Sequence, residues 1–201
     1  QMLFADKPKK LVFPLLKQLS LYVRSGIGMG DVKLDNINIH RNAEGERIPK
    51  YSDIDGGICS EHSSEELLQA WESLSKSVEG SEYDLNEIIA NAVTQHNVNF
   101  GKNKSLQKSY DSFKLKSKKV AYFSTTPDYT FGGSVDAAKT FFFKNQRSLI
   151  MAFTQESPKG HKDAVRECIK GITSRAQNID IKATGICFVM GLLGNNALPR
   201  Y

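Results

Sequence analysis

The chain has 201 residues, which suits one domain or two small ones. Hydrophobic residues make up 40% and charged residues 24%, so the chain can bury a core, and wholesale disorder is disfavoured. The net charge of +5 is compatible with an anionic partner such as phosphate, but it is too small to indicate a nucleic-acid-binding protein.

The spacing of the cysteines and the length of the apolar runs disfavour disulfide-rich, zinc-binding and membrane-spanning proteins. An odd number of cysteines without C-x-x-C spacing argues against a disulfide scaffold or a structural zinc site and favours free thiols in a reducing compartment. These are Cys59, Cys168 and Cys187. The longest apolar run, Ala183–Gly194, has about half of the roughly 20 residues that a transmembrane helix needs, and the N-terminus lacks a signal-peptide pattern. Because the chain begins at Gln1 and stops at Tyr201, we expect both ends to be cuts in something longer.

From the N-terminus, apolar spacing predicts a helix over Phe13–Ser25, with Pro14 in its first turn. Alternating apolar and polar residues then predict a short half-buried strand within Val32–His40. A turn signal at Asn42–Gly45 leads to a returning strand at Lys50–Ser52. This part of the chain is therefore expected to form a helix followed by a β-hairpin.

The middle of the chain is expected to be largely helical. Ser64–Lys76 has one apolar face that Ser64 can cap, and Asp84–Gln95 has the same spacing. Lys102–Lys119 carries seven lysines with apolar residues between them, and we interpret it as either a mobile arm or a solvated helix. The overlapping polar stretch Gly101–Ser117 is the part of the chain that most resembles a linker.

Towards the C-terminus, Val120–Phe123 is expected to be extended, and Phe141–Phe143 and Leu149–Phe153 form apolar clusters. Asp163–Arg175 is predicted to be helical. Asp180–Leu193 is apolar nearly all round, which is typical of a central buried helix. The expected fold is mainly α with a small β-hairpin.

The most informative pattern is D-x-K-x-x-N, formed by Asp31, Lys33 and Asn36 between the first helix and the first strand. It resembles the catalytic loop of protein kinases. Phosphoryl transfer needs a carboxylate that orients the attacking hydroxyl, an ammonium that offsets phosphoryl charge, and oxygen ligands for magnesium. The resemblance implies that Asp31 is the catalytic base, Lys33 contacts phosphate and Asn36 is a metal ligand.

A second match lies on the returning strand, where Asp53-Ile54-Asp55-Gly56-Gly57 is similar to the kinase segment that contains D-F-G. Two registers fit, and they make either Asp53 or Asp55 the ligand for Mg²⁺ (or Mn²⁺). We prefer Asp53, because the other register puts a charge where a buried apolar residue is usual. Without the resemblance, both carboxylates belong to an ordinary turn before the glycines.

Two further matches follow in the order that the kinase family has them. Thr126-Pro127-Asp128-Tyr129 is similar to the T-P-x-Y of a kinase activation segment, and this implies that Thr126 shapes the substrate loop beside Asp31 and Lys33. The run from Asp180 to Gly194, with Pro199 beyond, resembles the central helix of the kinase large lobe. There the acid, here Asp180, bonds the backbone of the catalytic loop and has a structural role.

The chain also departs from the kinase pattern. Met29 and Gly30 replace the usual His and Arg before the catalytic Asp, and Gly132 and Gly133 replace the Pro and Glu of A-P-E. Neither a glycine-rich nucleotide loop nor a V-A-x-K lysine precedes Asp31. The resemblance therefore implies a protein kinase-like large, C-terminal lobe, with the N-lobe absent from this chain. The nearest analogues are divergent kinases such as bacterial effectors.

On this resemblance, residues 1–201 form a single kinase-like C-lobe. Residues 11–57 hold a helix, the catalytic loop and the metal loop. Residues 58–119 form a helical, basic insertion in the activation segment, and residues 120–201 hold the substrate-loop region and the central helix. The implied activity is ATP-dependent transfer of phosphate to a protein Ser/Thr hydroxyl with Mg²⁺ (or Mn²⁺).

The implied partners are a protein substrate and an N-lobe or second chain that completes the ATP site, and neither nucleic acid nor a transmembrane segment is expected. The implied location is the cytoplasm, or a host cell into which an effector is secreted. Three alternatives stay open: a pseudokinase binding module, a small-molecule phosphotransferase of the aminoglycoside or choline type, and a helical adaptor whose motif matches are accidental.

Overall fold

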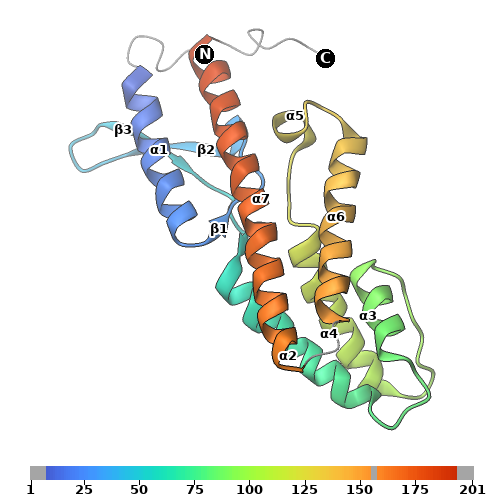
Figure 1. The fold of residues 1–201 in the computed structure, drawn as a ribbon. Helices are drawn as coiled ribbons and strands as arrows, with labels where there is room; N and C mark the ends of the chain where they lie inside the picture. Colours follow the sequence, from blue (N-terminus) through green and yellow to red (C-terminus); the bar gives the residue numbers. More distant parts are fainter. Residues whose placement is uncertain (1–7, 155–157, 194–201) are drawn as a thin grey trace. The chain divides into compact units, whose positions relative to one another are not determined.

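The computed structural model describes residues 8–154 and 158–193, and Figure 1 gives its element labels. It is mainly helical (68%) with two small two-stranded sheets, as the expected mostly-α fold requires. The described chain forms two compact units. Unit 1 contains residues 8–58, 124–138 and 174–193, and unit 2 contains the described residues of 59–123 and 139–173. None of the described helices combines the length and the apolarity that crossing a membrane requires.

Unit 1 begins with helix α1 (Pro8–Arg24), whose buried side chains Leu11, Leu15 and Leu19 recur on one face. The remaining elements of unit 1 are short, apart from the second half of a long helix. They are β1 (Ile27–Gly28), η1 (Leu34–Asn36), β2 (Ile37–Arg41), β3 (Arg47–Tyr51), β4 (Ile58–Cys59), α5 (Pro127–Thr130) and the last part of α7 (Pro158–Leu193).

The two sheets of unit 1 are small. β1 pairs with β4, and β2 pairs with β3 in an antiparallel hairpin whose register sets Ile37 opposite Tyr51. The predicted hairpin is confirmed, although its first strand starts later and its second earlier than the alternation indicated. The core of the unit packs α1 and the loop after β1 against α7, through Leu11, Leu15, Leu19, Met29, Val32, Tyr51, Ala183 and Cys187.

Unit 2 is a helical unit. Its elements are α2 (Ser60–Val78), α3 (Leu85–Val93), α4 (Lys104–Ala121), most of α6 (Val135–Phe153) and the first part of α7. α4 packs against both α2 and α3. The largest fully buried side chains include Leu67, Leu74, Ile89, Leu106, Tyr110, Phe113, Leu149 and Phe153.

Three sequence expectations about helices are wrong. Pro14 lies inside α1 and not in its first turn, because the helix already begins at Pro8. Ser64 does not cap α2: it is buried within the helix and its hydroxyl donates to the Ser60 carbonyl at 2.5 Å. Of the two alternatives for the lysine-rich segment, the helix is confirmed as α4, and the arm and the linker are wrong, because Leu106, Tyr110 and Phe113 form a buried stripe along α4 beneath the lysines.

The end of the chain also differs from the expectation. The helices predicted at Asp163–Arg175 and Asp180–Leu193 are one continuous helix, α7. Its last part is not buried all round, since Ile181 is 52% exposed while Asp180, Ala183, Thr184 and Cys187 are buried. Gly194 and Pro199, which complete the predicted motif, lie outside the described residues.

Candidate functional site

The loop that follows β1 is bound through its backbone by Asp180 of α7. The Asp180 carboxylate accepts hydrogen bonds from the backbone N–H of Met29 at 2.6 Å and of Gly30 at 2.8 Å, and the residue is 1% exposed. Gly30 has a φ of 81°, a left-handed conformation that favours glycine. Burial raises the pKa of Asp180 to about 6, and the two backbone hydrogen bonds oppose that shift. The carboxylate is therefore ionised at neutral pH and fixes the path of the loop.

The Asp31 carboxylate is the centre of the site. Lys33 Nζ donates to Asp31 Oδ2 at 2.7 Å, the Thr126 hydroxyl donates to Asp31 Oδ1, and Asn36 Nδ2 donates to the Asp31 carbonyl at 2.9 Å and to Oδ2 at 3.2 Å. Burial raises the pKa of Asp31, but the hydrogen bonds from Lys33, Thr126 and Asn36 outweigh it and hold the pKa below its ordinary value. Asp31 is thus an ionised, oriented acceptor.

Lys33 takes part in the same network and adds positive charge to it. Its ammonium lies 3.5 Å from Thr126 Oγ1 as well as 2.7 Å from Asp31 Oδ2. The hydrogen bond to Asp31 raises the pKa of Lys33, and the nearby carboxylates of Asp35 and Asp53 raise it further. The lysine is therefore charged at every physiological pH, and Asp53 lies within its electrostatic reach.

Asn36 joins this loop to the end of the hairpin. Its backbone carbonyl accepts from the Ser52 N–H at 2.8 Å and from the Ser52 hydroxyl at 3.1 Å. Its side chain is buried and uses its amide N–H groups on Asp31. The side-chain oxygen of Asn36 is consequently the atom that could serve as a ligand, and Ser52, the residue before Asp53, is bonded to the backbone of Asn36.

Asp53 and Asp55 lie in the exposed turn after β3. Asp53 has a φ of 56°, a left-handed conformation that Asp tolerates better than most residues and that often marks functional turns. The turn closes through a hydrogen bond from Gly57 N to the Ile54 carbonyl at 2.9 Å. The carboxylate of Asp53 acts on Lys33 and raises the pKa of its ammonium.

Thr126 comes from a part of the sequence far from Asp31, and two contacts bring it there. Ser124 N donates to the Gly56 carbonyl at 3.2 Å, so the segment before Thr126 runs beside the turn that holds Asp53. Thr126 then leads into α5, whose Tyr129 packs against the core of unit 1 that includes Met29 and Val32 of the Asp31 loop. Burial raises the pKa of the Tyr129 phenol. Lys182 Nζ of α7 donates to the Thr130 carbonyl at 3.1 Å and fixes the end of α5.

Two contributors were not singled out from the sequence. Ser52 ties the hairpin to Asn36, and its only signal was a hydroxyl next to Asp53. Gln177 of α7 donates from Nε2 to the carbonyls of Val23 at 3.1 Å and Ile27 at 3.2 Å, which fixes the chain on both sides of the turn before the loop. A polar residue inside a long helix carries no sequence signal for such a role.

The metal ligands that the site could provide are oxygen atoms, from the amide of Asn36 and the carboxylates of Asp53 and Asp55. Within the described ranges, no cluster of three or more His, Cys, Asp or Glu side chains could hold a metal ion. Magnesium usually keeps several waters and takes one or two protein carboxylates together with phosphate oxygens. The donor chemistry of Asn36 with Asp53 or Asp55 fits such an ion in the presence of a nucleotide, and it does not fit a metal held by protein alone.

All seven residues singled out from the sequence lie in unit 1. Hydrogen bonds join Asp31, Lys33, Asn36 and Thr126, and Asp180 supports their loop through its backbone. Asp53 joins them through charge, and Asp55 lies two residues further along the exposed turn. Comparisons with family models, curated proteins and solved structures find no match for this chain.

Proposed function

We propose that this chain is the large lobe of a divergent protein kinase, which transfers the γ-phosphoryl group of ATP to a Ser or Thr hydroxyl of a protein. The observation that carries the proposal is the convergence of Lys33, Asn36 and Thr126 on the ionised carboxylate of Asp31. Phosphoryl transfer depends on positioning and charge neutralisation more than on covalent chemistry, and this arrangement supplies both.

The proposal assigns a role to each residue of the site. Asp31 orients the acceptor hydroxyl and takes its proton. Lys33, which neutralises Asp31 in the free site, offsets negative charge on the transferred group. Asn36 and Asp53 would hold Mg²⁺ (or Mn²⁺), and the bound metal would neutralise phosphate charge. Asp53 is favoured over Asp55 because Asp53 acts on the charge of Lys33.

Thr126 favours a protein acceptor over a small amino alcohol. Its hydroxyl donates to Asp31, and the helix that follows it, α5, is held by the packing of Tyr129 on the core and by the hydrogen bond from Lys182 to Thr130. Such a segment beside the base offers a backbone surface for an extended peptide. Small-molecule phosphotransferases normally lack the T-P-x-Y pattern on which this contact depends.

The proposal includes a second lobe or a partner chain that covers the nucleotide, because the sequence has neither a glycine-rich loop nor a V-A-x-K lysine before Asp31. A pseudokinase is the second candidate. This alternative is favoured by Met29, which stands where kinases have a polar His. Its side chain is apolar and only 3% exposed.

The test measures transfer of labelled phosphate from ATP and Mg²⁺ to generic acceptor proteins, by the full-length protein. Asp31→Ala is expected to lower the rate by roughly 10²–10⁴, as removal of a positioned base does. Asp163→Ala is the control, since Asp163 is exposed and belongs to unit 2, outside the site. Equal incorporation by wild type and Asp31→Ala would exclude Asp31 as the base. No incorporation by either protein, with binding of Mg²⁺ and ATP retained, would favour the pseudokinase.

A further inference from the structure

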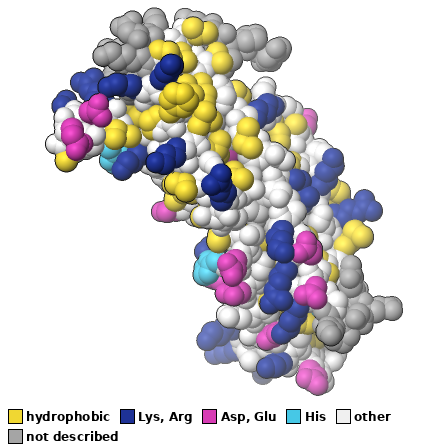
Figure 2. All heavy atoms as spheres, turned by 60° about the vertical axis from the view of Figure 1, so that its left-hand side comes forward, with side chains coloured by type: hydrophobic (Ala, Val, Ile, Leu, Met, Phe, Trp, Pro, Cys, Tyr) yellow, Lys and Arg dark blue, Asp and Glu magenta, His cyan; other side chains and the backbone are white. Residues whose placement is uncertain are grey.

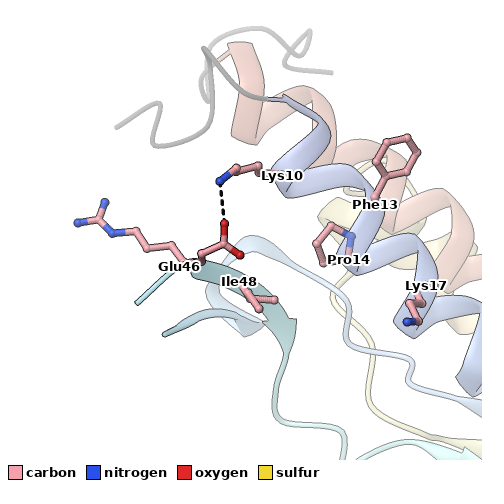
Figure 3. A pocket seen from close by; sticks show the side chains of 7 residues that line it. Lys10, Phe13, Pro14, Lys17, Glu46 and Ile48 are labelled. Atoms are coloured by element: carbon pink, nitrogen blue, oxygen red, sulfur yellow. Dashed lines mark hydrogen bonds and ion pairs between the residues drawn. The ribbon is translucent and has the colours of Figure 1, made fainter. Parts of the chain in front are cut away.

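A second surface of unit 1 has the features of a binding site and shares no residue with the candidate phosphoryl-transfer site. It is a hollow of about 380 Å³ between α1 and the β2–β3 hairpin, shown in Figure 3. Four of its lining residues, Lys10, Phe13, Pro14 and Lys17, have the i, i+3, i+4, i+7 spacing of one helix face. The opposite wall is Glu46, Arg47 and Ile48. We call this surface the hairpin groove.

The hairpin groove has an apolar floor that is open to solvent. Phe13 is 63% exposed, and Pro14 and Ile48 are half-buried beside it. Figure 2 shows hydrophobic side chains gathered on this face of unit 1, with Lys and Arg side chains around them. The exposed side chain of Phe13 does not contribute to the core of unit 1, because the buried face of α1 is formed by Leu11, Leu15 and Leu19.

The rim of the hairpin groove is predominantly positive. It carries Lys10, Lys17 and Arg47 against a single acid, Glu46. That acid is already engaged, since Lys10 Nζ donates to it at 3.3 Å and the Asn42 amide at 3.4 Å. Lys17 and Arg47 are consequently the cations that the groove presents to an incoming group.

The register of the hairpin adds an independent sign of an anionic ligand. Arg47 stands directly opposite Arg41 on the neighbouring strand. Like charges at directly opposed positions of an antiparallel pair are destabilising. An acidic group bound next to Arg47 would offset the repulsion between Arg41 and Arg47.

The two walls of the groove are held in place in the free protein. Gln18 of α1 donates from Nε2 to the Pro49 carbonyl at 3.0 Å, and its Oε1 accepts from the Tyr51 N–H at 3.2 Å. These bonds tie α1 to β3 directly behind the groove. A ligand would therefore enter a preformed site and would lose little affinity to ordering it.

From these observations we infer that the hairpin groove docks an acidic peptide segment of a partner protein. An apolar side chain of that segment packs on Phe13, Pro14 and Ile48, and its carboxylates pair with Lys17 and Arg47. A concave site with a small apolar floor suits a peptide better than a lipid surface. Three cations on its rim are too few for the extended phosphate tracking of nucleic acid.

The experiment selects binders from a display library of short random peptides with the whole chain, and then measures the affinity of the most enriched peptide by fluorescence anisotropy. The enriched sequences are expected to combine Asp or Glu with Leu, Ile or Phe. Phe13→Ser and the double variant Lys17→Glu/Arg47→Glu are each expected to weaken binding about tenfold or more, as loss of a central anchor or of a charge pair does.

Matched controls come from α4 of unit 2. Leu115→Ser removes an apolar side chain of similar exposure (55%), and Lys104→Glu/Lys108→Glu makes the same change in net charge at exposed positions. Each control is expected to change the affinity less than about twofold, because the groove is untouched. The far-ultraviolet circular dichroism and the Trp71 fluorescence of every variant verify that it is folded.

Three results would overturn the inference. The first is enrichment of peptides without acids, or no enrichment at all. The second is an equal loss of affinity in the control variants, which would show charge attraction without a site. The third is binding to vesicles of phosphatidylcholine and phosphatidylserine that Phe13→Ser abolishes while no peptide binds, which would assign the groove to a membrane surface. None of these results depends on phosphoryl transfer, so the proposed function is tested separately.

Discussion

Both units have apolar cores, and they differ in what their buried polar side chains do. In unit 1 the buried side chains of Asp180 and Asn36 bond to the loop of Asp31 and fix its path. In unit 2 the buried rings pack in pairs: Phe113 meets Phe153, and Tyr110 meets Phe100.

The buried polar atoms that lack a partner sharpen this contrast. Among the described residues these side-chain atoms all belong to unit 2: Trp71 Nε1, Ser75 Oγ, Ser117 Oγ and His161 Nδ1. A polar atom left unsatisfied costs free energy, so in unit 2 packing outweighs hydrogen bonding. In unit 1 the buried carboxylate of Asp180 and the buried amide of Asn36 are both hydrogen-bonded to the loop of Asp31. We therefore expect unit 1 to respond most to polar substitutions and unit 2 to cavities.

The largest effect is expected from Phe113→Ala in unit 2. Phe113 is fully buried and meets Phe153 edge to face at 5.2 Å, so its truncation leaves a cavity and should cost about 4 kcal/mol of the free energy of unfolding. Trp71, the single tryptophan of the chain, packs on the same Phe153 and reports the unfolding of unit 2 by fluorescence in urea.

Leu115→Ala is the matched control for Phe113→Ala. It lies two residues away on the same helix and is 55% exposed, so the change should stay within about 0.5 kcal/mol. Similar losses in both variants would mean that the burial of Phe113 is not what stabilises α4, since Ala is the better helix former in both, and would contradict the comparison.

A polar substitution, Asp180→Ala, is expected to have the corresponding effect on unit 1. It leaves the buried N–H groups of Met29 and Gly30 without acceptors, which should cost roughly 3 kcal/mol. The measurement is amide hydrogen exchange at Met29 and Gly30, which should accelerate, together with unfolding in urea. Asp163→Ala, at an exposed position of the same helix, should leave both amides protected. Unchanged exchange in Asp180→Ala would remove the support that this carboxylate is assigned.

Local patterns predicted local structure well. The proximity of Asp31, Lys33 and Asn36 follows from their lying within six residues, and the hairpin follows from alternation and a turn signal. The lysine-rich helix was harder, because the charged residues between Leu106, Tyr110 and Phe113 conceal the buried stripe that makes α4 part of a core. Continuity of α7 was missed because a change in composition near Arg175 resembles an end, although no Gly or Pro stands there to break the helix.

Long-range contacts of the site could not be derived from spacing. Thr126 meets Asp31 across 95 positions of sequence and Asp180 meets Met29 across 151, and only the resemblance to kinases pointed to either pair. Gln177 reaches two carbonyls next to the loop and had no signal at all. Tertiary packing decides such pairs, and one sequence does not encode it in a local pattern.

A smaller effect in unit 1 is expected from Gly28→Ala. A Cβ at Gly28 would lie 2.6 Å from the Cβ of Ala176 on α7, so β1 or the helix must shift, at a cost of about 1–3 kcal/mol. Gly185→Ala, further along α7, meets nothing within 4 Å and should stabilise the helix by about 1 kcal/mol. Unfolding in urea distinguishes the two signs. A stabilised Gly28→Ala variant would show that β1 and α7 are not closely packed.

The smallest effects are expected on the stability of the protein at low pH, where one carboxylate of each unit can be compared. Burial raises the pKa of Asp31 in unit 1, but hydrogen bonds from Lys33, Thr126 and Asn36 outweigh it and lower the pKa. The pKa of Glu66 in unit 2 is lowered mainly by its hydrogen bond from Lys116. A carboxyl whose pKa is lower in the folded state contributes stability above its unfolded pKa and loses it as the pH falls through the folded value. Asp31→Asn and Glu66→Gln should therefore each flatten the loss of stability below about pH 4.

Salt should separate these two carboxylates. The side chain of Asp31 is 12% exposed and that of Glu66 is 29% exposed, so added salt screens the pair of Glu66 with Lys116 more strongly. The Glu66→Gln effect is expected to be below about 1 kcal/mol and to shrink further in high salt. The Asp31→Asn effect should persist, because hydrogen bonds from Thr126 and Asn36 act at short range and are shielded from solvent. Urea unfolding at a series of pH values in low and high salt measures both. Equal screening of the two would mean that the Asp31 network is as open to water as a surface ion pair, and the contrast between the units would not extend to their charges.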